Sequence, residues 1–392
     1  MAILDVLLDL TPLDTPSRLR GIGHYVAYLG AAMATLTPSE KQGLDIRGLV
    51  SLSGEIVGPL QWSGTDPMPY PVGQGMRYIW DRRFKLTASL LSLRPRPRLL
   101  HVTQNLGTPW GSLVPRVITC HDMIRLVLHE QYVKASRAYL EAFRLAELAR
   151  FSLARRVIAV SRYTADDLMR VLKVPSSRID VVHHGVDTKR FRPPSSPDEE
   201  ALHREQRRAL GIDQKPYFLY VGAVDPRKKA ELLVSAFVRA RIPDVDLVFA
   251  GWLTDDEQQR LQGIWRAEGG TNPLRFLGFV EDDLMNALMH GALGLVFPSI
   301  YEGFGMPVLE AMAAGCPVIT TSATSLGEVA GDAALLIPGN DRSALQDTLV
   351  RLVTDNVLRR QLREAGLARA QQFTWKNTAL GTVDSYAKAL RA

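Results

Sequence analysis

The chain has 392 residues, of which 46% are hydrophobic and 22% are charged, and it carries a net charge of +6. This is the composition of an ordinary globular protein, and the length predicts two or three domains. The positive charge favours anionic partners, namely nucleotide phosphates, acidic lipid or nucleic acid, or is simply that of a basic enzyme. No uninterrupted apolar run reaches about 18 residues, so no membrane-spanning helix is expected.

The two cysteines of the chain, Cys120 and Cys316, lie far apart in apolar surroundings. We expect buried thiols in a reducing compartment rather than a disulfide. Neither cysteine belongs to a CxxC motif, and no histidine pair has the spacing of metal ligands. The sequence therefore predicts no metal site.

The N-terminal segment is an apolar stretch that ends near Asp9. It lacks the basic residues that begin a signal peptide, so we interpret it as the first strand. A loop over residues 11–23 follows, and a helix-like run begins at His24. The loop lacks the third glycine of a dinucleotide-binding fingerprint. Its Gly23 amide still lies where a helix start attracts a phosphate.

Residues 77–98 combine seven basic residues and one acidic residue with interleaved aromatic and aliphatic side chains. A basic amphipathic helix of this kind can lie on an anionic membrane surface. The alternative is a surface helix whose apolar face packs on the N-terminal sheet, and the sequence favours the two equally. Nucleic acid is not the expected partner, because no RNA- or DNA-binding module surrounds the patch.

Two predicted strands of the N-terminal half end in histidines. One covers residues 115–120 and is followed by His121. A side chain at the carboxyl end of a parallel strand points into the crevice where open α/β sheets bind ligands. The other strand ends at His183 and His184, which face opposite ways in an extended chain and so form no joint metal site. For each of these two, a structural role competes with a position in the crevice.

A stretch rich in proline and charge, residues 193–215, separates this half from a second alternation of strands and helices. We interpret it as an interdomain linker with a short helix. The next strand ends at Gly222, and Arg227 and Lys228 follow just before a helix over residues 231–241. Fixed cations beside a helix start would hold a diphosphate. The alternative is a solvated charge cluster.

The decapeptide of residues 301–310 is the most informative stretch of the chain. It follows an apolar strand over residues 292–297 and runs into four strong helix formers. Glu302 and Glu310 bracket a loop with two glycines, which let the backbone approach a ligand closely. Amides at the following helix start attract an anion. A closing turn with two solvated glutamates is the alternative interpretation.

The spacing of Glu302 and Glu310, with seven residues between them, resembles the signature of the retaining glycosyltransferases of family four, which have the GT-B fold. The Val-x-Thr-x-His-Asp pattern that ends at Asp122 and the pair Arg227 and Lys228 resemble further motifs of this family. The resemblance covers most of the chain. It implies an α/β protein with two Rossmann-like, doubly wound domains that face a central cleft.

The resemblance also implies roles for individual residues. His121 and Glu302 stand where the family contacts the donor sugar, and Glu310 stands where it binds the nucleotide ribose. Arg227 and Lys228 stand where it holds the donor phosphates and stabilises the leaving nucleoside diphosphate. The other implied donor contacts are a glycine near the first helix, a residue beside the base, and the residues around the helix start before Glu310, namely Gly23, Val280, Phe304, Gly305, Met306, Pro307 and Val308.

The same resemblance predicts the domain boundaries. An N-terminal acceptor-binding domain covers residues 1–192, and a C-terminal helix over residues 376–392 crosses back onto it. Residues 193–215 form the linker. Residues 216–375 form the domain that binds the nucleotide sugar.

The expected function is retaining transfer of a hexose from a nucleotide diphosphate sugar to a glycan or polyprenyl-linked acceptor in polysaccharide biosynthesis. GDP-mannose is the expected donor. The family implies a front-face displacement without cofactor or metal, because cations of the protein replace the metal. We expect a cytoplasmic protein that contacts the inner face of the cytoplasmic membrane through residues 77–98.

Two alternative functions fit part of the same pattern. A GT-B sugar-nucleotide epimerase or hydrolase would share the nucleotide-binding half but would need different acid and base groups in the N-terminal half. A non-catalytic subunit that binds a sugar nucleotide and recruits a partner would retain the fold. The intact set of His121, Arg227, Lys228, Glu302 and Glu310 argues against the second alternative.

Overall fold

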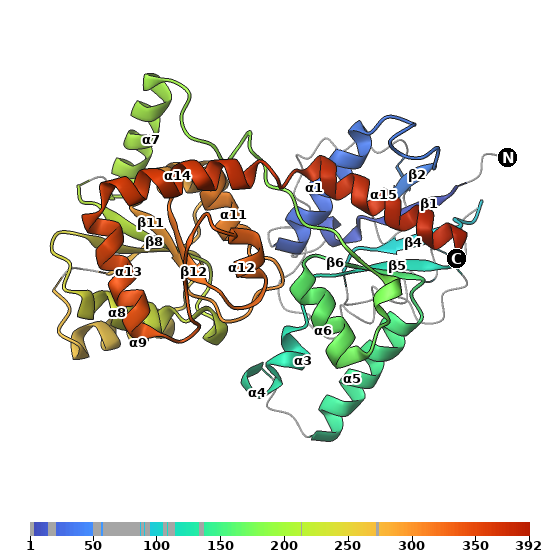
Figure 1. Cartoon of the computed structure of the whole chain (residues 1–392), viewed down its shortest axis with the longest axis horizontal. Coiled ribbons are helices and arrows are strands. Elements are labelled where there is room, and N and C mark those ends of the chain that lie inside the picture. The colour runs from blue at the N-terminus through green and yellow to red at the C-terminus, as the bar shows by residue number, and fades with distance from the viewer. Residues whose placement is uncertain are drawn as a thin grey trace. The chain divides into compact units, whose positions relative to one another are not determined.

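The chain folds into two compact units, which we call unit 1 (Met1–Gly185 with Thr374–Ala392) and unit 2 (Val186–Phe373). Figure 1 shows the computed structural model, in which each unit contains a sheet with helices on both faces. The residues that the structure describes are 4–14, 21–49, 56–57, 87, 90, 95–104, 108, 114–132, 137–212, 214–271 and 274–392.

The described strands of unit 1 form a seven-stranded sheet in the order β3-β2-β1-β4-β5-β6-β7. Neighbouring strands are parallel, except that β2 and β3 are antiparallel. The strand order reverses between β1 and β4, which creates a topological switch point. The strands are β1 (Val6–Asp9), β2 (Ile46–Leu49), β3 (Ile56–Val57), β4 (Leu99–Val102), β5 (Arg116–Cys120), β6 (Arg156–Ala159) and β7 (Ile179–Val181).

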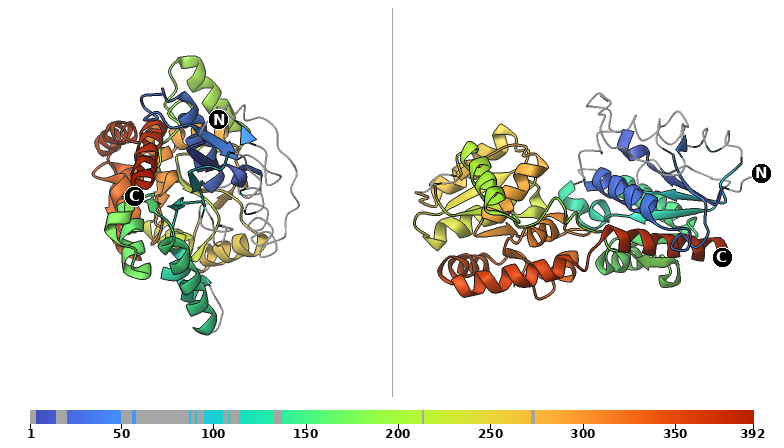
Figure 2. Two further views of the ribbon diagram at one scale, coloured as in Figure 1. Left: turned by 90° about the vertical axis from the view of Figure 1, so that its right-hand side faces the viewer. Right: turned by 90° about the horizontal axis from the view of Figure 1, so that it is seen from above.

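Helices cover both faces of this sheet, and the central strands β1, β4 and β5 are buried along their whole length. Such burial on both faces is expected for parallel strands between helical layers. The C-terminal helix α15 packs against α1 (Figures 1 and 2). The helices are α1 (Gly21–Thr35), α3 (Ile124–Val127), α4 (His129–Tyr132), α5 (Arg137–Ser152), α6 (Arg162–Leu172) and α15 (Trp375–Arg391).

The described strands of unit 2 form a six-stranded, wholly parallel sheet in the order β10-β9-β8-β11-β12-β13. Here the order reverses between β8 and β11, which is the second switch point. The main core of unit 2 packs one face of this sheet against α8 and α13. The strands are β8 (Tyr217–Val221), β9 (Asp246–Ala250), β10 (Leu274–Phe276), β11 (Gly294–Phe297), β12 (Val318–Thr321) and β13 (Leu335–Ile337).

Several helices of unit 2 begin at side-chain caps that are local in sequence. Ser196 Oγ accepts from the backbone N–H of Glu199, and Thr254 forms a reciprocal capping box with Glu257. The helices are α7 (Pro197–Ala209), α8 (Ala230–Ala240), α9 (Asp255–Ala267), α10 (Asp282–Gly291), α11 (Met306–Ala313), α12 (Thr324–Ala330), α13 (Arg342–Thr354) and α14 (Asn356–Ala370), with the 3-10 turn η4 (Pro226–Lys228).

The structure corrects the predicted linker over residues 193–215, because this stretch lies wholly inside unit 2. Its helix α7 packs on α10, and the buried Arg207 side chain donates to the carbonyl of Ala287 at 3.2 Å. Proline and charge density suggested an exposed connector, whereas Glu200 forms close contacts with Arg207 and His290 where α7 meets α10. The units change over at Gly185 rather than at residue 192, and again at Thr374 rather than at residue 376.

None of the described helices is both long enough and apolar enough to cross a membrane. Most of the basic segment 77–98 falls outside the described residues, so the prediction of a membrane-binding helix there stays a prediction.

Candidate active site

The switch point of unit 2 explains why two distant motifs meet. Strands β8 and β11 are hydrogen-bonded neighbours, with Phe218 opposite Gly294 and Leu219 opposite Leu295. Because the strands are parallel, the loops that follow them leave the same edge of the sheet. The cations after β8 and the glutamate loop after β11 are therefore brought together by topology.

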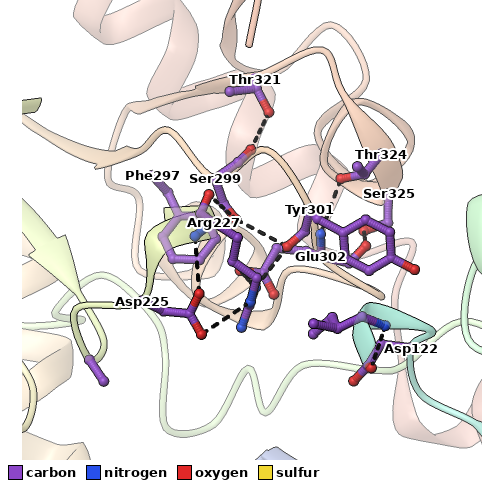
Figure 3. A network of polar contacts seen from close by, with 12 residues as sticks. Asp122, Asp225, Arg227, Phe297, Ser299, Tyr301, Glu302, Thr321, Thr324 and Ser325 are labelled. Carbon is purple, nitrogen blue, oxygen red and sulfur yellow. Dashed lines mark hydrogen bonds and ion pairs between the residues drawn. The ribbon is translucent and has the colours of Figure 1, made fainter. Parts of the chain in front are cut away.

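Arg227 is held from several sides at this edge (Figure 3). Asp225 Oδ1 accepts from the Arg227 backbone N–H at 3.0 Å and caps η4, while its Oδ2 lies 3.5 Å from Arg227 Nε. Arg227 Nη1 donates to the carbonyl of Tyr301 at 2.7 Å and forms an ion pair with Glu302. The side chains of Arg227 and Glu302 are only 13% and 14% exposed. The site therefore contains a preorganised, largely desolvated guanidinium, that of Arg227, which is ion-paired with the carboxylate of Glu302.

The backbone of Glu302 is fixed by the start of α12. Its N–H donates to Thr324 Oγ1 at 3.3 Å, and its carbonyl accepts from Ser325 Oγ at 2.8 Å (Figure 3). Ser299 and Thr321 secure the preceding turn, since Thr321 Oγ1 donates to the carbonyl of Ser299 at 2.6 Å. The hydroxyls of Thr321, Thr324 and Ser325 were not among the predicted site residues, because their partners lie 22 or 23 residues away in sequence.

Asp225 is a further residue that the sequence interpretation left without a role. A local signal for it existed, because an Asp directly before Pro226 is a favoured cap of a helical turn. Its ion pair with Arg227 had no such signal. The structure thus adds a carboxylate on one side of the guanidinium to the glutamate on the other.

Lys228 lies beside this pair, with its Nζ 5.5 Å from the centre of the Phe297 ring. Burial lowers the pKa of Lys228, and the charge of Glu302 counteracts part of that shift. An ammonium over an aromatic face gains a cation–π attraction. Arg227 and Lys228 together can stabilise a negative charge that develops at this edge of the sheet.

The loop after Glu302 reverses the chain into α11. Gly305 has φ of +102° and is the N-cap residue, and Pro307 is the second residue of the helix. A side chain at position 305 would collide with Leu326 and would be strained at this φ. The predicted helix start around Pro307 is therefore confirmed. Glu310 lies in the second turn of α11 and is half-buried.

Val280 lies beyond β10, in a loop that is tied to its neighbour. The N–H of Gly251 donates to the carbonyl of Gly278 at 2.8 Å, which joins the loops after β9 and β10. The Val280 side chain is buried, at 6% exposure.

In unit 1, His121 follows β5, and its Nε2 donates to the carbonyl of Thr103 at 2.8 Å. A carbonyl only accepts, so Nε2 carries the proton and Nδ1 of the neutral ring is an acceptor. Burial lowers the pKa of His121 to about 4, which keeps the ring neutral near pH 7. Tyr25 of α1 contacts the ring edge to face at 4.8 Å, and the predicted phosphate contact Gly23 lies in the first turn of the same helix.

His184 is buried in the core of unit 1, with 5% of its surface exposed. Its ring stacks on Tyr25 at 4.8 Å and lies 5.9 Å from Trp375 at the start of α15. Next to it, a Cβ atom on Gly185 would collide with the backbone of Trp375. The surroundings of His184 therefore favour a structural role over a position in the ligand-binding crevice.

The predicted site residues thus gather in two groups, one in each unit. Unit 2 brings together Arg227, Lys228 and Glu302, and unit 1 places His121 near the start of α1. Among the described residues, no group of three or more His, Cys, Asp or Glu side chains is arranged to hold a metal ion.

Comparisons with known proteins agree with this arrangement. Residues 20–190 match the model of Glycosyltransferase Family 4, and residues 203–369 match that of Glycosyl transferases group 1. The chain is 32% identical over 281 residues to O-antigen chain mannosyltransferase B of Escherichia coli, and the match covers 69% of each protein.

Two further similarities bear on length and on fold. The chain is 27% identical to the serotype-specific mannosyltransferase WbdA of Escherichia coli over 73% of this chain, but it spans only 34% of that protein. Sucrose-phosphate synthase from Thermosynechococcus elongatus superposes with a TM-score of 0.73 at 23% identity, over 98% of both chains. With the switch-point motifs and the mannosyltransferase similarity in agreement, the chain belongs to the family-four glycosyltransferases with the GT-B fold.

Proposed function

We propose that this protein is a retaining hexosyltransferase that uses a nucleotide diphosphate sugar. The observation that carries the proposal is the clamp of Arg227 and Lys228 at the switch point of unit 2, with Glu302 on the guanidinium. Two fixed cations beside each other are suited to stabilise the negative charge of a leaving diphosphate. The similarity to a mannosyltransferase supports mannose as the sugar and GDP-mannose as the donor.

In the proposed reaction, the bond from the sugar C1 to the β-phosphate oxygen breaks while the acceptor oxygen bonds to C1 from the same face. The acceptor's proton passes to the departing phosphate oxygen, so no residue of the protein has to be a nucleophile. Arg227, Lys228 and the amides of the residues 304–308 stabilise the charge of the leaving group. Glu302 and His121 orient the sugar.

The remaining proposed contacts hold the donor. Glu310 accepts hydrogen bonds from the ribose hydroxyls, and the backbone at Val280 lies beside the base. Gly23 offers its amide to the diphosphate, because the first N–H groups of a helix have no partner within the helix. We propose that no metal is required, since the protein supplies the cations. Undiminished turnover after EDTA treatment and dialysis is the expected result.

A second part of the proposal concerns the acceptor. We propose a glycan or polyprenyl-linked saccharide, which the protein would reach at the inner face of the cytoplasmic membrane through residues 77–98. Seven cations in this stretch are the supporting feature. Co-sedimentation with anionic vesicles should weaken as salt rises, and binding that depends on neither anionic lipid nor salt would contradict this part.

One experiment tests the central proposal against its alternatives. Labelled GDP-mannose, UDP-glucose and other nucleotide sugars are incubated with the protein, with and without a lipid-linked acceptor, and the product's anomeric configuration is read by NMR. Transfer with retention is the expected result. Free sugar or an epimer without acceptor would favour a hydrolase or epimerase. Binding without turnover under any acceptor would favour a non-catalytic subunit.

A further inference from the structure

A cavity lies at the amino ends of the unit 2 strands, at the opposite end of the sheet from the clamp of Arg227 and Lys228. It has a volume of about 560 Å³ and is lined by the residues that precede β8, β11 and β12 together with the first turns of α14. The wall residues at the three strand starts are Pro216, Leu293 and Pro317. The volume is within the range of small-molecule sites.

This cavity is separate from the clamp of Arg227 and Lys228. The clamp follows the carboxyl end of β8, whereas Pro216 precedes its amino end. A strand rises about 3.3 Å per residue, so the five residues of β8 place the two sites roughly 17 Å apart. A ligand in one of them does not reach the other unless it spans the sheet.

Three arginines of α14 line the cavity, namely Arg359, Arg360 and Arg363. Arg359 is fixed, because its Nη1 donates to the carbonyls of Leu352 and Val353, the latter at 2.8 Å. The methylene stem of Arg363 packs beside Gly315, with its Cγ 3.5 Å from the position that a Cβ atom there would take. The three side chains thus present guanidinium groups from adjacent turns of one helix.

These arginines lack the carboxylate partners that several other arginines of unit 2 have. Arg239 pairs with Glu268, and Arg275 pairs with Asp246 at 3.4 Å. Among the described residues, no ion pair involves Arg359, Arg360 or Arg363.

The lining has an excess of positive charge. Glu364 is its one carboxylate, which leaves a net charge of +2 when His290 is neutral. Burial lowers the pKa of His290, and its Nδ1 donates to the carbonyl of Ala314 at 3.1 Å. The charge of the arginines is therefore available to a ligand that carries about two negative charges.

We propose that this cavity is a second ligand site of unit 2, which binds a phosphoryl group through Arg360 and Arg363. Guanidinium groups present paired N–H donors that match phosphate oxygens, and several of them suit a dianion. The ligand is either a soluble phosphorylated molecule or the headgroup of an anionic phospholipid, since both offer the same phosphoryl chemistry. Occupancy would brace the start of α14 against the amino ends of the sheet strands.

The test is calorimetric titration of the full chain with inorganic pyrophosphate. The expected result is two sites per chain, one at the clamp and one in this cavity. The double variant Arg360→Gln with Arg363→Gln should weaken one site by about tenfold or more and leave the other unchanged. Lys228→Ala should do the reverse, so failure of this inference is distinguishable from failure of the proposed donor site.

Two controls keep the result specific. Arg266→Gln on α9 removes an exposed arginine that bonds only to Gln262 among the described residues, and both sites should survive it. Arg363→Lys keeps the positive charge but loses the paired N–H donors of the guanidinium. We expect its affinity for pyrophosphate to lie between those of the wild type and the double variant. A single site that Lys228→Ala abolishes, or equal weakening by Arg266→Gln, would overturn the proposal.

Vesicles decide the source of the phosphoryl group. Binding to phosphatidylglycerol vesicles that the double variant loses, with no binding to phosphatidylcholine, identifies a headgroup. Pyrophosphate binding in the cavity without such vesicle binding identifies a soluble ligand. Both results support a phosphoryl site, whereas absence of both overturns it.

Discussion

The ammonium group of Lys228 occupies the space that a Cβ atom on Gly222 would fill. Gly222 follows β8 with φ of +120°, and its N–H donates to the carbonyl of Ala250 at 2.8 Å. The glycine is therefore required twice, once for its backbone conformation and once for the packing of the cation. The ammonium group of Lys228 also lies over the ring of Phe297, 5.5 Å from its centre.

We predict that Gly222→Ala damages the clamp. The new methyl group pushes Lys228 away, and the backbone strain costs about 1–3 kcal/mol. Donor-diphosphate affinity should fall by about tenfold, and the unfolding midpoint of unit 2 should drop. Gly263→Ala in α9 is the matched control, since a Cβ there meets nothing within 4 Å and alanine favours a helix interior. Equal behaviour of the two variants would contradict the packing argument.

Glu302→Gln should separate two effects of one side chain. The carboxylate competes with a phosphate for Arg227, so removing its charge should tighten binding of a bare nucleoside diphosphate several-fold. Turnover of the sugar donor should fall by about tenfold or more, because the orienting contact to the sugar is lost. Binding and single-turnover rates measured on the same preparation check this. Weaker diphosphate binding would show that Glu302 does not oppose it.

Glu310→Gln should have the opposite balance. This residue lies one helical turn into α11, and the proposed ribose contact is a charge-assisted hydrogen bond. We expect nucleotide affinity to fall by roughly tenfold, which corresponds to about 1.4 kcal/mol, while the rate at saturating donor changes little. Isothermal titration with the nucleoside diphosphate measures the first quantity and initial rates the second. A loss confined to the rate would remove Glu310 from the ribose role.

The buried histidines of unit 1 predict acid lability. His101 bonds to Tyr386 and Thr119, and burial lowers its pKa to about 3, while that of His121 falls to about 4. In the unfolded chain both titrate near 6.5. Between pH 6.5 and about 4 the unfolded chain therefore binds more protons, so the stability of unit 1 falls as pH falls through this window.

Urea unfolding at several pH values between 7 and 4 measures this loss. Each unit of pKa difference is worth about 1.4 kcal/mol, so the two histidines together should reduce the free energy of unfolding by several kcal/mol. His101→Gln should have a shallower pH dependence, although it is less stable at pH 7. An unchanged slope in that variant would contradict the assignment.

Much of the fold could be predicted from local patterns. Apolar strand runs and the glycine-to-helix turn at Gly305 depend on neighbours a few residues away, and these elements form where they were expected. The error was the linker over residues 193–215. Its composition resembles that of an exposed connector, and only the docking of α7 on α10 reveals where its charged side chains go.

The sequence by itself determined the family and the residue types of the clamp, because the spacing and the chemistry of the motif residues can be read directly from the order of residues in the chain. Tertiary structure alone decided that Asp225, Tyr301 and Glu302 surround Arg227, and that Thr324 and Ser325 fix the glutamate. These contacts join segments that a parallel sheet brings to one edge. Pairing of β8 with β11 is a non-local hydrogen-bonding choice, which no local pattern encodes.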